Sequence, residues 1–264
     1  MLKVCLVGVG RMGTAVAQEA AAYKDRLEIV SGIAGSESAL VGKKVPGTDA
    51  PVYAAGEWER AVAEAFYTIH FSAPEADEFL VPRLAARGKR MVIGTTGFTE
   101  EQTRKMRKAI EENLVSAVIA PNYSPLVNAQ FLLAKRAAEI LAPFGYEFGV
   151  VEEHHSGKKD APSGTARKIA KSVAEAAGAG TLRYRGEEVK QKEKNELDMG
   201  ILRLGGTPGI HELRVVGAHG RLTIESLMYS RADFAKGALE ALLWLEKKEE
   251  KGRIFGMEDV LGLK

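Results

Sequence analysis

The beginning of the chain combines a short apolar segment, a glycine-rich turn and a helical pattern. Leu2 to Val7 predicts a buried strand, and a helical pattern runs from Thr14 to Tyr23. In the intervening turn, Gly8 allows a tight bend, Gly10 lets a pyrophosphate approach the backbone and Gly13 lets the helix pack closely on the strand. This order predicts the dinucleotide-binding start of an α/β sheet. Glycines that serve only helix packing are the alternative.

Strand-like and helical patterns then alternate as far as Ile119. Such alternation predicts a parallel sheet covered by helices, with ligands outside the carboxyl ends of the strands. Capping-box patterns mark two helix starts, Ser72 with Glu75 and Thr99 with Gln102. The expected strands are Leu27–Ile33, Ala65–Phe71, Arg90–Ile93 and Val115–Ile119, and the expected helices are Glu57–Glu64, Pro74–Ala86 and Glu100–Glu112.

The loops after four of these strands should face the cofactor. An NAD-selective site usually has an acidic residue after the second strand, but none occurs there before Glu37. The Gly35-Ser36 turn, with Lys43 and Lys44 further on, favours a 2′-phosphate, so NADPH is expected, with NADH also usable. The predicted cofactor contacts are Gly8, Val9, Gly10, Arg11, Met12, Gly13, Phe71, Gly94, Thr95, Thr96, Ala120, Pro121, Asn122 and Tyr123.

After Tyr123 the pattern changes to strands in series, which predicts a second domain with an open mixed or antiparallel sheet. The expected fold class is therefore α/β, a Rossmann-type parallel-sheet domain plus a second α+β domain. Residues 1–124 and 232–264 are expected to bind the dinucleotide, and residues 125–231 to bind substrate and form the oligomer. The expected elements are helices Asn128–Leu141, Ser163–Ala177 and Ala232–Glu249, strands Tyr146–His154, Leu182–Arg185, Ile201–Leu204, Glu212–Gly217 and Arg221–Met228, and an exposed loop at Gly186–Asp198.

Composition excludes several classes of function. The formal charge of the 264 residues is only +2, so no nucleic-acid partner is expected. The apolar start, Leu2 to Val9, is too short to span a membrane and has no basic leader with a cleavage site, so no membrane partner and a cytoplasmic location are expected. Cys5 is the only cysteine, which excludes an internal disulfide.

The densest chemistry lies in residues 152–166, EEHHSGKKDAPSGTA. On a strand, His154 and His155 point to opposite faces, and histidine exchanges protons near neutral pH. Lys158 offers a second proton or an anion clamp, and the helix start at Ser163 favours an anion. A metal site built with Glu152 and Asp160 is the weaker alternative, because the tandem histidines suit one ion poorly and no third His or Cys lies nearby in sequence; no metal is predicted. A surface histidine pair beside an ordinary helix cap is the plain alternative.

With this motif the chain resembles the 4-hydroxy-tetrahydrodipicolinate reductases, whose sequences carry E-x-H-H-x-x-K-x-D-A-P-S-G-T-A. The resemblance implies NAD(P)H-dependent reduction of the cyclic dihydrodipicolinate synthase product, a small dicarboxylate, in lysine and diaminopimelate biosynthesis, by a homotetramer. The resemblance also implies that His154 is the acid/base residue and Lys158 the proton donor. It further implies that the substrate's carboxylates are bound by His155, Ser163, Gly164 and Thr165. Supporting motifs recur at Gly10–Gly13, Gly94–Phe98, Asn122–Ser124, Arg203–His211 and Arg231.

Two departures from the family pattern occur in the first half. Many members read GxxGRMG where this chain has the shorter Gly8–Gly13, and many carry Asp-Phe-Thr-Arg-Pro-Glu where this chain has His70–Glu75, without the arginine. Two other functions compete with the reductase. An amino-acid dehydrogenase of similar build would share the glycine loop, and a dinucleotide-sensing regulator would bind cofactor without chemistry.

Overall fold

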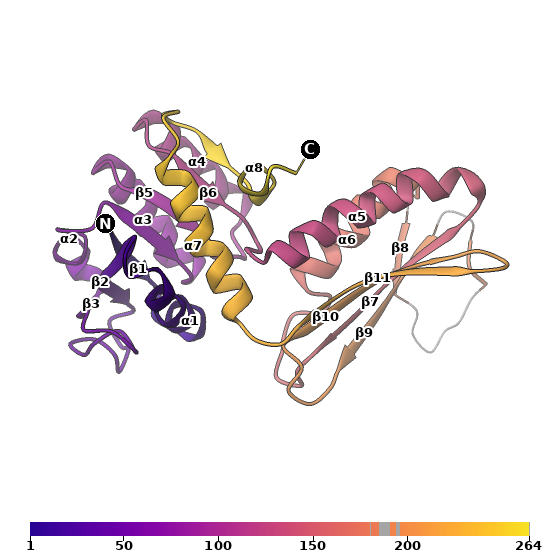
Figure 1. Cartoon of the computed structure of the whole chain (residues 1–264), viewed down its shortest axis with the longest axis horizontal. Helices are drawn as coiled ribbons and strands as arrows, with labels where there is room; N and C mark the ends of the chain where they lie inside the picture. Colours follow the sequence, from indigo (N-terminus) through magenta and orange to yellow (C-terminus); the bar gives the residue numbers. More distant parts are fainter. Residues whose placement is uncertain (180, 185–190, 194–195, 264) are drawn as a thin grey trace. The chain divides into compact units, whose positions relative to one another are not determined.

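The computed structural model describes residues 1–179, 181–184, 191–193 and 196–263. The chain forms two compact units. The first consists of Met1–Ser124 and Arg231–Lys264, and the second of Pro125–Ser230 (Figure 1).

The first unit is built on a seven-stranded parallel sheet, ordered β12-β6-β5-β4-β1-β2-β3. The strand order reverses between β1 and β4, which is where open α/β sheets bind their ligands. The predicted Rossmann-type parallel sheet is confirmed. The strands are β1 (Leu2–Val7), β2 (Leu27–Ala34), β3 (Val52–Ala54), β4 (Tyr67–His70), β5 (Arg90–Ile93), β6 (Ala117–Ile119) and β12 (Ile254–Phe255).

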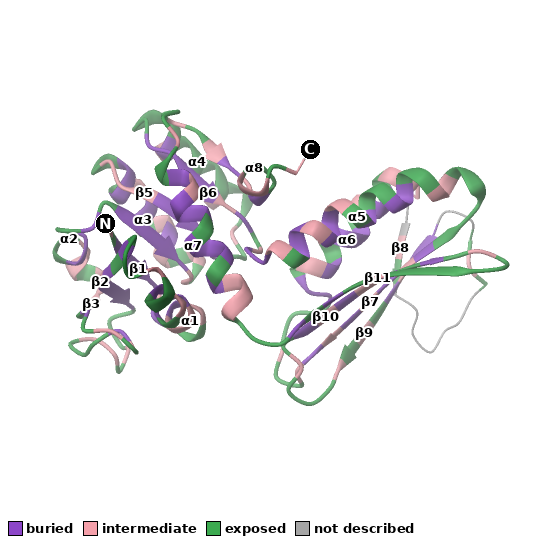
Figure 2. Ribbon diagram, in the orientation of Figure 1, coloured by how far each residue is buried: buried purple, intermediate pink, exposed green. Residues whose placement is uncertain are grey.

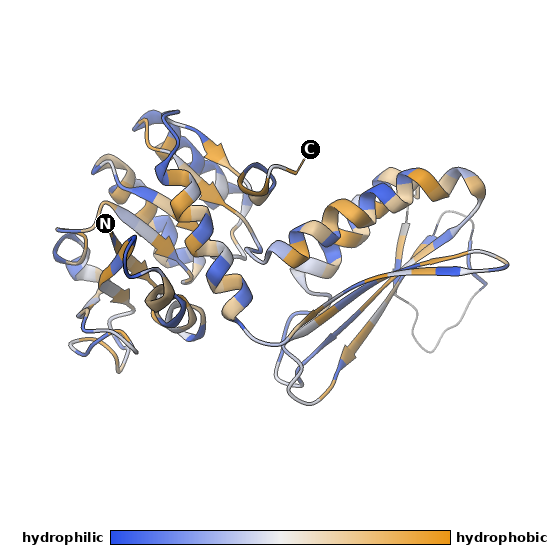
Figure 3. Ribbon diagram, viewed as in Figure 1, coloured by the Kyte–Doolittle hydropathy of each residue, from blue (hydrophilic) through white to orange (hydrophobic). Residues whose placement is uncertain are grey.

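Helices cover both faces of this sheet. In β1, Val4 and Leu6 pack in the cluster that holds α1 and α7, whereas Cys5 and Val7 pack in the cluster of α3 and α4. Burial on both faces explains why the strands read as continuous apolar runs, and Figures 2 and 3 show them as buried and hydrophobic. The helices are α1 (Arg11–Ala20), α2 (Trp58–Ala61), α3 (Pro74–Ala86), α4 (Glu100–Glu112), α7 (Ala232–Glu246) and α8 (Met257–Leu261), with 3-10 turns at Ala21–Tyr23 and Ala55–Glu57.

The helix starts correct one sequence prediction and confirm another. Thr99 and Gln102 form the reciprocal capping box of α4, as predicted. The N-cap of α3 is Ala73, so the predicted capping box of Ser72 is wrong; the Ser72 hydroxyl donates instead to Asp77 Oδ1 at 3.0 Å. The predicted helix Glu57–Glu64 is also wrong in extent, because only Trp58–Ala61 is α-helical.

The second unit has a five-stranded mixed sheet, ordered β11-β10-β7-β9-β8. The β11–β10 and β10–β7 pairs are antiparallel, and the β7–β9 and β9–β8 pairs are parallel. The predicted mixed sheet is confirmed, and α5 and α6 lie side by side on one of its faces (Figure 1). The elements are α5 (Pro125–Leu141), a 3-10 turn at Ala142–Phe144, β7 (Glu147–His154), α6 (Gly164–Ala177), β8 (Thr181–Tyr184), β9 (Glu196–Arg203), β10 (Gly209–Val216) and β11 (Arg221–Met228).

The end of the predicted charged loop Gly186–Asp198 is wrong, because β9 begins at Glu196. Glu196 is buried and pairs with Arg183 of β8, so a charged residue there is held inside the sheet by an ion pair. Residues 186–190 and 194–195 of that loop, and Arg185 of the predicted strand, lie outside the described residues.

Candidate active site

Three neighbouring strands of the second unit bring polar side chains to the end of β7. Glu152 and His154 lie on β7 itself. The register places His211 of β10 opposite Glu152, and Arg203 of β9 opposite His154. Glu152, His154 and His211 are all buried, at 0%, 6% and 4% exposure. Buried polar groups are normally hydrogen-bonded, and here Glu152 receives most of the hydrogen bonds, whereas Nδ1 of His154 and Nδ1 of His211 have no partner among the described residues.

Glu152 is the hub of this group. Its carboxylate accepts hydrogen bonds from the Ser163 N–H, at 3.1 and 3.0 Å from its two oxygens, and from Arg203 Nη2 at 2.9 Å. Burial alone would raise the pKa of Glu152, but the hydrogen bonds from Ser163 and Arg203 outweigh it, so the pKa lies below its ordinary value. Glu152 therefore holds a negative charge inside the unit, matched by the guanidinium of Arg203.

His154 stands beside this carboxylate, with Nδ1 3.5 Å from Glu152 Oε2. Burial is the largest cause that lowers the pKa of His154; Lys158 and Arg203 lower it further, and Glu152 partly offsets them. The His154 ring is therefore mainly neutral near pH 7. A side chain at Gly209 would crowd it, since an added Cβ would lie 3.2 Å from Nε2.

His211 packs edge-on against His154, with 5.0 Å between ring centroids. Its Nε2 is 3.1 Å from the Ser163 hydroxyl, and its backbone carbonyl accepts from Gln130 of α5 at 2.7 Å. Burial lowers the pKa of His211 to about 4, with a further contribution from His154, so this ring is neutral near pH 7.

The backbone at the amino end of α6 is accessible. Ser163 is the N-cap, and its hydroxyl accepts from the Ala166 N–H at 3.1 Å. The next residue, Gly164, is exposed, and nothing lies within 4 Å of the place that a Cβ would take. A helix amino end with accessible backbone attracts anions. The predicted substrate residues Ser163, Gly164 and Thr165 thus lie together at this helix start.

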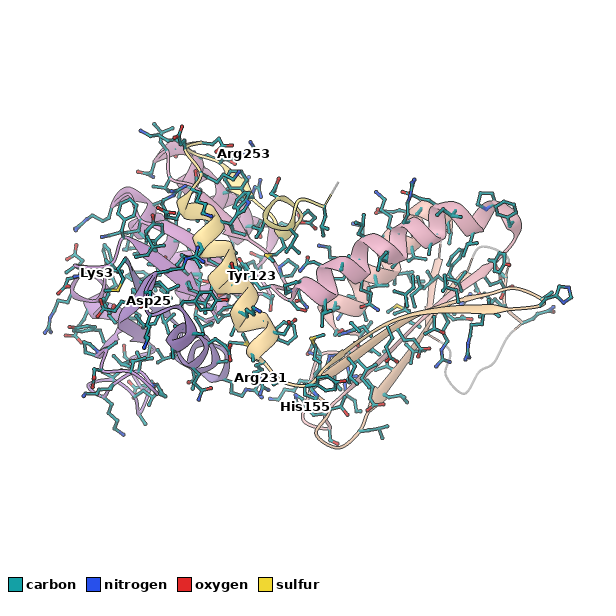
Figure 4. All side chains as sticks on the ribbon, in the orientation of Figure 1. Lys3, Asp25, Tyr123, His155, Arg231 and Arg253 are labelled. Carbon is teal, nitrogen blue, oxygen red and sulfur yellow. The ribbon has the colours of Figure 1, made fainter. Side chains whose placement is uncertain are left out.

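The loop between His155 and Ser163 is fixed at its base by the segment that follows β9. The His155 N–H donates to Thr207 O at 2.8 Å, and the Ser156 N–H to Gly205 O at 3.2 Å. Lys158 is half-buried, and its Nζ lies 2.7 Å from Asp160 Oδ1. His155, labelled in Figure 4, follows the last residue of β7 and is half-buried. The predicted residues His154, His155, Lys158 and Ser163 are therefore all supplied by one strand end, its loop and the next helix.

The glycine loop of the first unit fits a dinucleotide. Gly8 has φ +90°, and a Cβ there would lie 2.3 Å from Phe71 O. A Cβ at Gly13 would lie 2.0 Å from Gly8 O, so the start of α1 packs closely against the turn that directly follows β1. Gly10 has nothing within 4 Å of its would-be Cβ, so its backbone stays open at the start of α1. A pyrophosphate needs this approach.

The remaining predicted cofactor residues differ in how far they are exposed. Tyr123 is 1% exposed, and its hydroxyl donates to the carbonyls of Ile93 and Val118, so its side chain serves the core (Figure 4). Val9 is likewise buried, which leaves only its backbone for a ligand. Thr95 and Ala120 are buried, Met12, Phe71, Gly94 and Asn122 are half-buried, and Arg11, Thr96 and Pro121 are exposed.

Arg203 and His211 are not among the site residues expected from the sequence, and Glu152 is expected there only as a possible metal ligand. Both residues lie at the ends of the Arg203–His211 motif that supports the family resemblance, and this motif could have indicated that they belong to the site. With His211 the structure also supplies a further histidine, which the metal alternative lacked, since Glu152, His154 and His211 bring ligand atoms within 4.8 Å of one another. The Glu152 oxygens already accept from Ser163 and Arg203, and the adjacent guanidinium repels a cation. The absence of a metal stays a prediction.

Comparisons with known proteins agree over the whole chain. The family model described as dihydrodipicolinate reductase, N-terminus, matches residues 2–123, and the corresponding C-terminus model matches residues 127–261. The 4-hydroxy-tetrahydrodipicolinate reductase of Methanosarcina barkeri is 36% identical over 270 residues and covers 100% of both chains. That of Methanopyrus kandleri is 35% identical over 273 residues, with 99% of this chain and 97% of the relative covered.

Among solved structures, the dipicolinate-bound dihydrodipicolinate reductase from Paenisporosarcina sp. TG-14 shares the fold. It aligns with a TM-score of 0.76 at 22% identity, over 98% of this chain and 99% of that one.

A parallel sheet with a glycine loop, a mixed sheet that carries the His154–Lys158 motif, and relatives that are reductases together indicate a pyridine-nucleotide-dependent reductase. Within that class, the chain belongs to the dihydrodipicolinate reductase family. The family, the fold class and the reductase function expected from the sequence are confirmed. Among the described residues, none of the helices is both long and apolar enough to cross a membrane.

Proposed function

We propose that the chain reduces the cyclic product of dihydrodipicolinate synthase to tetrahydrodipicolinate with NAD(P)H, using His154 and Lys158 as its proton-handling groups. The observation that carries this assignment is the convergence of His154, the Lys158 loop and the start of α6 at the end of β7. Bound NAD(P)H supplies the hydride, the protein supplies one proton, and the 4-hydroxyl group of the substrate leaves as water.

The start of α6 is the proposed cradle for the substrate's carboxylates. Gly164 offers open backbone there, and the helix dipole adds a partial positive charge. Ser163 and Thr165 flank it, and His155 leads into the same loop. The structure of the Paenisporosarcina relative holds dipicolinate, which supports a dicarboxylate ligand for this chain.

Of the two proton-handling groups, Lys158 is the better candidate for the proton donor. Its Nζ lies 2.7 Å from Asp160 Oδ1, which orients the side chain while leaving it partly accessible. Burial lowers the pKa of His154, so this ring is neutral before substrate binds. We assign His154 the acid/base role, in which it takes up a proton only when a dianionic ligand adds negative charge beside it.

The test measures NADPH consumption with the synthase product made in situ. Replacing either proton-handling group, in His154→Ala or Lys158→Ala, is expected to lower kcat about a hundredfold or more while NADPH binding persists. Lys159→Ala, an exposed lysine in the same loop, is the matched control and should retain wild-type turnover. Wild-type kcat in both site variants would refute the assignment. Oxidation of free amino acids, or cofactor binding with no turnover, would instead support the dehydrogenase or the sensor.

We propose NADPH as the preferred cofactor, with NADH usable. Gly35 and Ser36 are exposed after β2, where a selective NAD site has an acid. Lys44 is engaged in an exposed ion pair with Asp49, so Lys43 is the better candidate for the 2′-phosphate. Lys43→Ala should lower kcat/KM for NADPH several-fold and leave that for NADH unchanged, with Lys24→Ala, another exposed lysine, as control. Equal effects on both cofactors would contradict this role.

We also propose a cytoplasmic homotetramer joined through the open face of the five-stranded sheet. In β10, Leu213 and Val215 are buried, whereas Arg214 and Val216 are exposed on the other face. Light scattering should give four times the chain mass of 28.5 kDa, and Val216→Asp should lower it. Cell fractionation should recover the protein with cytoplasmic markers. A monomeric mass, or recovery with membranes, would contradict the respective proposal.

A further inference from the structure

A second buried polar group lies in the first unit, beneath the loops predicted to hold the cofactor. His70 is the last residue of β4 and Asp77 lies in the first turn of α3, and both side chains are 0% exposed. His70 Nδ1 lies 2.7 Å from Asp77 Oδ1, and its Nε2 lies 2.8 Å from the hydroxyl of Thr68. Because a carboxylate oxygen accepts, Nδ1 of His70 is the donor.

This pair does not belong to the general core of the sheet. The neighbouring residues of β4 and β5, such as Ile69 and Val92, are buried apolar side chains. A buried polar pair stabilises a fold less well than apolar packing of the same volume. Moreover, Asp77 Oδ2 is buried and has no hydrogen-bond partner among the described residues, which adds a cost. Such an arrangement is expected where a polar group has a positional role.

The pair connects directly to two loops. Asp77 Oδ1 also accepts from the Ser72 hydroxyl at 3.0 Å, so one oxygen joins His70 to the loop after β4. The Ser72 N–H in turn donates to Thr95 Oγ1 at 3.0 Å, in the loop after β5. The chain His70–Asp77–Ser72–Thr95 thus ties together two of the loops at the carboxyl edge of the sheet.

The loop after β4, which these hydrogen bonds link to the loop after β5, is in close contact with the glycine turn. The Phe71 carbonyl lies where a Cβ of Gly8 would be, and the Phe71 ring lies where a Cβ of Gly94 would be, at 2.3 and 2.2 Å. Phe71 also packs edge-on against Tyr123 at 5.9 Å between ring centroids. A shift of Ser72 would therefore displace Phe71 and change the backbone positions of Gly8 and Gly94, because these contacts are closely packed.

The carboxylate beneath the loop comes from α3, seven residues after His70 in the sequence, and it is held by the histidine.

We propose that His70 and Asp77 are positioning residues that fix the Phe71–Pro74 and Gly94–Gly97 loops for dinucleotide binding, through Ser72 and Thr95. The inference rests on the proposed cofactor site. It predicts that the pair governs cofactor affinity, whereas the substrate cradle of the second unit and the proton-handling groups are independent of it.

The experiment measures the Kd of NADPH by fluorescence titration of the full chain, together with kcat and both KM values. Ser72→Ala cuts the link to the loop and leaves the buried pair intact; it is expected to raise the Kd and KM for NADPH about tenfold, with kcat and the substrate KM within about twofold. Asp77→Ala should likewise raise the Kd and KM for NADPH while leaving kcat and the substrate KM nearly unchanged. His70→Asn keeps a donor at the position of Nδ1 and is expected to stay near the wild-type Kd.

Ser31→Ala is the matched control, because Ser31 is buried in β2 and its hydroxyl donates to Ala61 O at 2.6 Å. It should leave the Kd unchanged. An unchanged Kd in Ser72→Ala, or an equal loss of kcat in all variants, would overturn the positioning role. Absence of NADPH binding by the wild-type chain would overturn the proposed function itself, which separates the two failures.

Discussion

The ring of His211 lies edge-on to the ring of His154, 5.0 Å between centroids, with Glu152 beside both. Two imidazoles so close in a buried site cannot both be charged without strong repulsion. Burial lowers the pKa of both rings, and His211 is shifted to about 4. His211 is thus a neutral neighbour that supports Ser163 and restricts protonation to His154.

The depressed pKa of His211 predicts a pH-dependent stability. Unfolded, the residue takes up a proton near its ordinary pKa of 6.5, whereas folded it does so only near 4. Its neutral burial therefore favours the fold above pH 6.5, and this contribution is lost as the pH falls from 6.5 towards 4. The loss from this residue should be about 2 kcal/mol between pH 6.5 and pH 5. Urea unfolding at the two pH values measures it.

Other groups also titrate in that interval, so the comparison is made against His211→Gln. This variant has no imidazole to protonate in the unfolded state, and its stability should fall by about 2 kcal/mol less than that of the wild type over the same interval. His219→Gln, an exposed histidine in the β10–β11 hairpin, is the control and should follow the wild type. Parallel pH curves for His211→Gln and the wild type would show that His211 is not held neutral.

The pKa of His154 predicts the shape of the rate profile. If the free enzyme needs neutral His154, kcat/KM should fall on the acidic side with a midpoint below the ordinary 6.5, because burial and the neighbouring cations lower this pKa. The dianionic substrate raises the pKa in the complex, so the acidic limb of kcat should lie at higher pH than that of kcat/KM. Steady-state rates between pH 5 and 9 check both limbs. A kcat/KM limb at or above 6.5 contradicts the neutral role.

Sequence patterns predicted the bounds of five elements and missed two of the shortest strands. The bounds of β1, α3, β5, α4 and β11 agree with the prediction, because apolar periodicity and cap residues define them locally. In contrast, β3 and β12 were missed. Val52–Ala54 and Ile254–Phe255 are too short to show a period, and they are strands because they pair with β2 and β6.

The same distinction holds for the site. His154, Lys158 and Ser163 are close in sequence, and one motif revealed them together. Arg203 and His211 reach the site only through the registers of β9 and β10 with β7. Alternation along β10 indicates which residues face inward, but the neighbour that each one meets depends on pairing between distant segments.

The geometry of the glycine turn predicts that replacement by alanine costs more stability at Gly8 than at Gly42, although both have a positive φ. Gly8 has φ +90° and Gly42 has φ +77°, but only at Gly8 would a Cβ strike another backbone atom, Phe71 O. Gly42→Ala should cost about 1 kcal/mol from backbone strain alone. Gly8→Ala should cost at least about 2 kcal/mol more and weaken NADPH binding, because the turn and the Phe71 loop must move apart. Urea unfolding and NADPH titration measure the two effects; equal stability losses would show that the contact with Phe71 is not tight.

The last prediction concerns Glu152, whose charge is enclosed by Ser163 and Arg203. Glu152→Gln keeps the size but removes the charge, and it turns one acceptor into a donor that faces donors. The unfolding free energy should fall by about 3 kcal/mol at pH 7, as when one member of a buried ion pair is lost. Glu212→Gln, which breaks the partly exposed pair with Arg214 on the same sheet, should cost at most about 1 kcal/mol.

The pH dependence separates charge from shape in the Glu152 variant. The folded pKa of Glu152 is lowered, so its stabilising contribution is present above the ordinary value of 4.5 and is lost as the pH falls through the folded value. The stability gap between wild type and Glu152→Gln should therefore narrow below pH 4.5. A gap that stays constant to lower pH would mean that the side-chain packing matters and the charge does not. If both glutamate variants lose the same stability at pH 7, Glu152 is not the hub of the site.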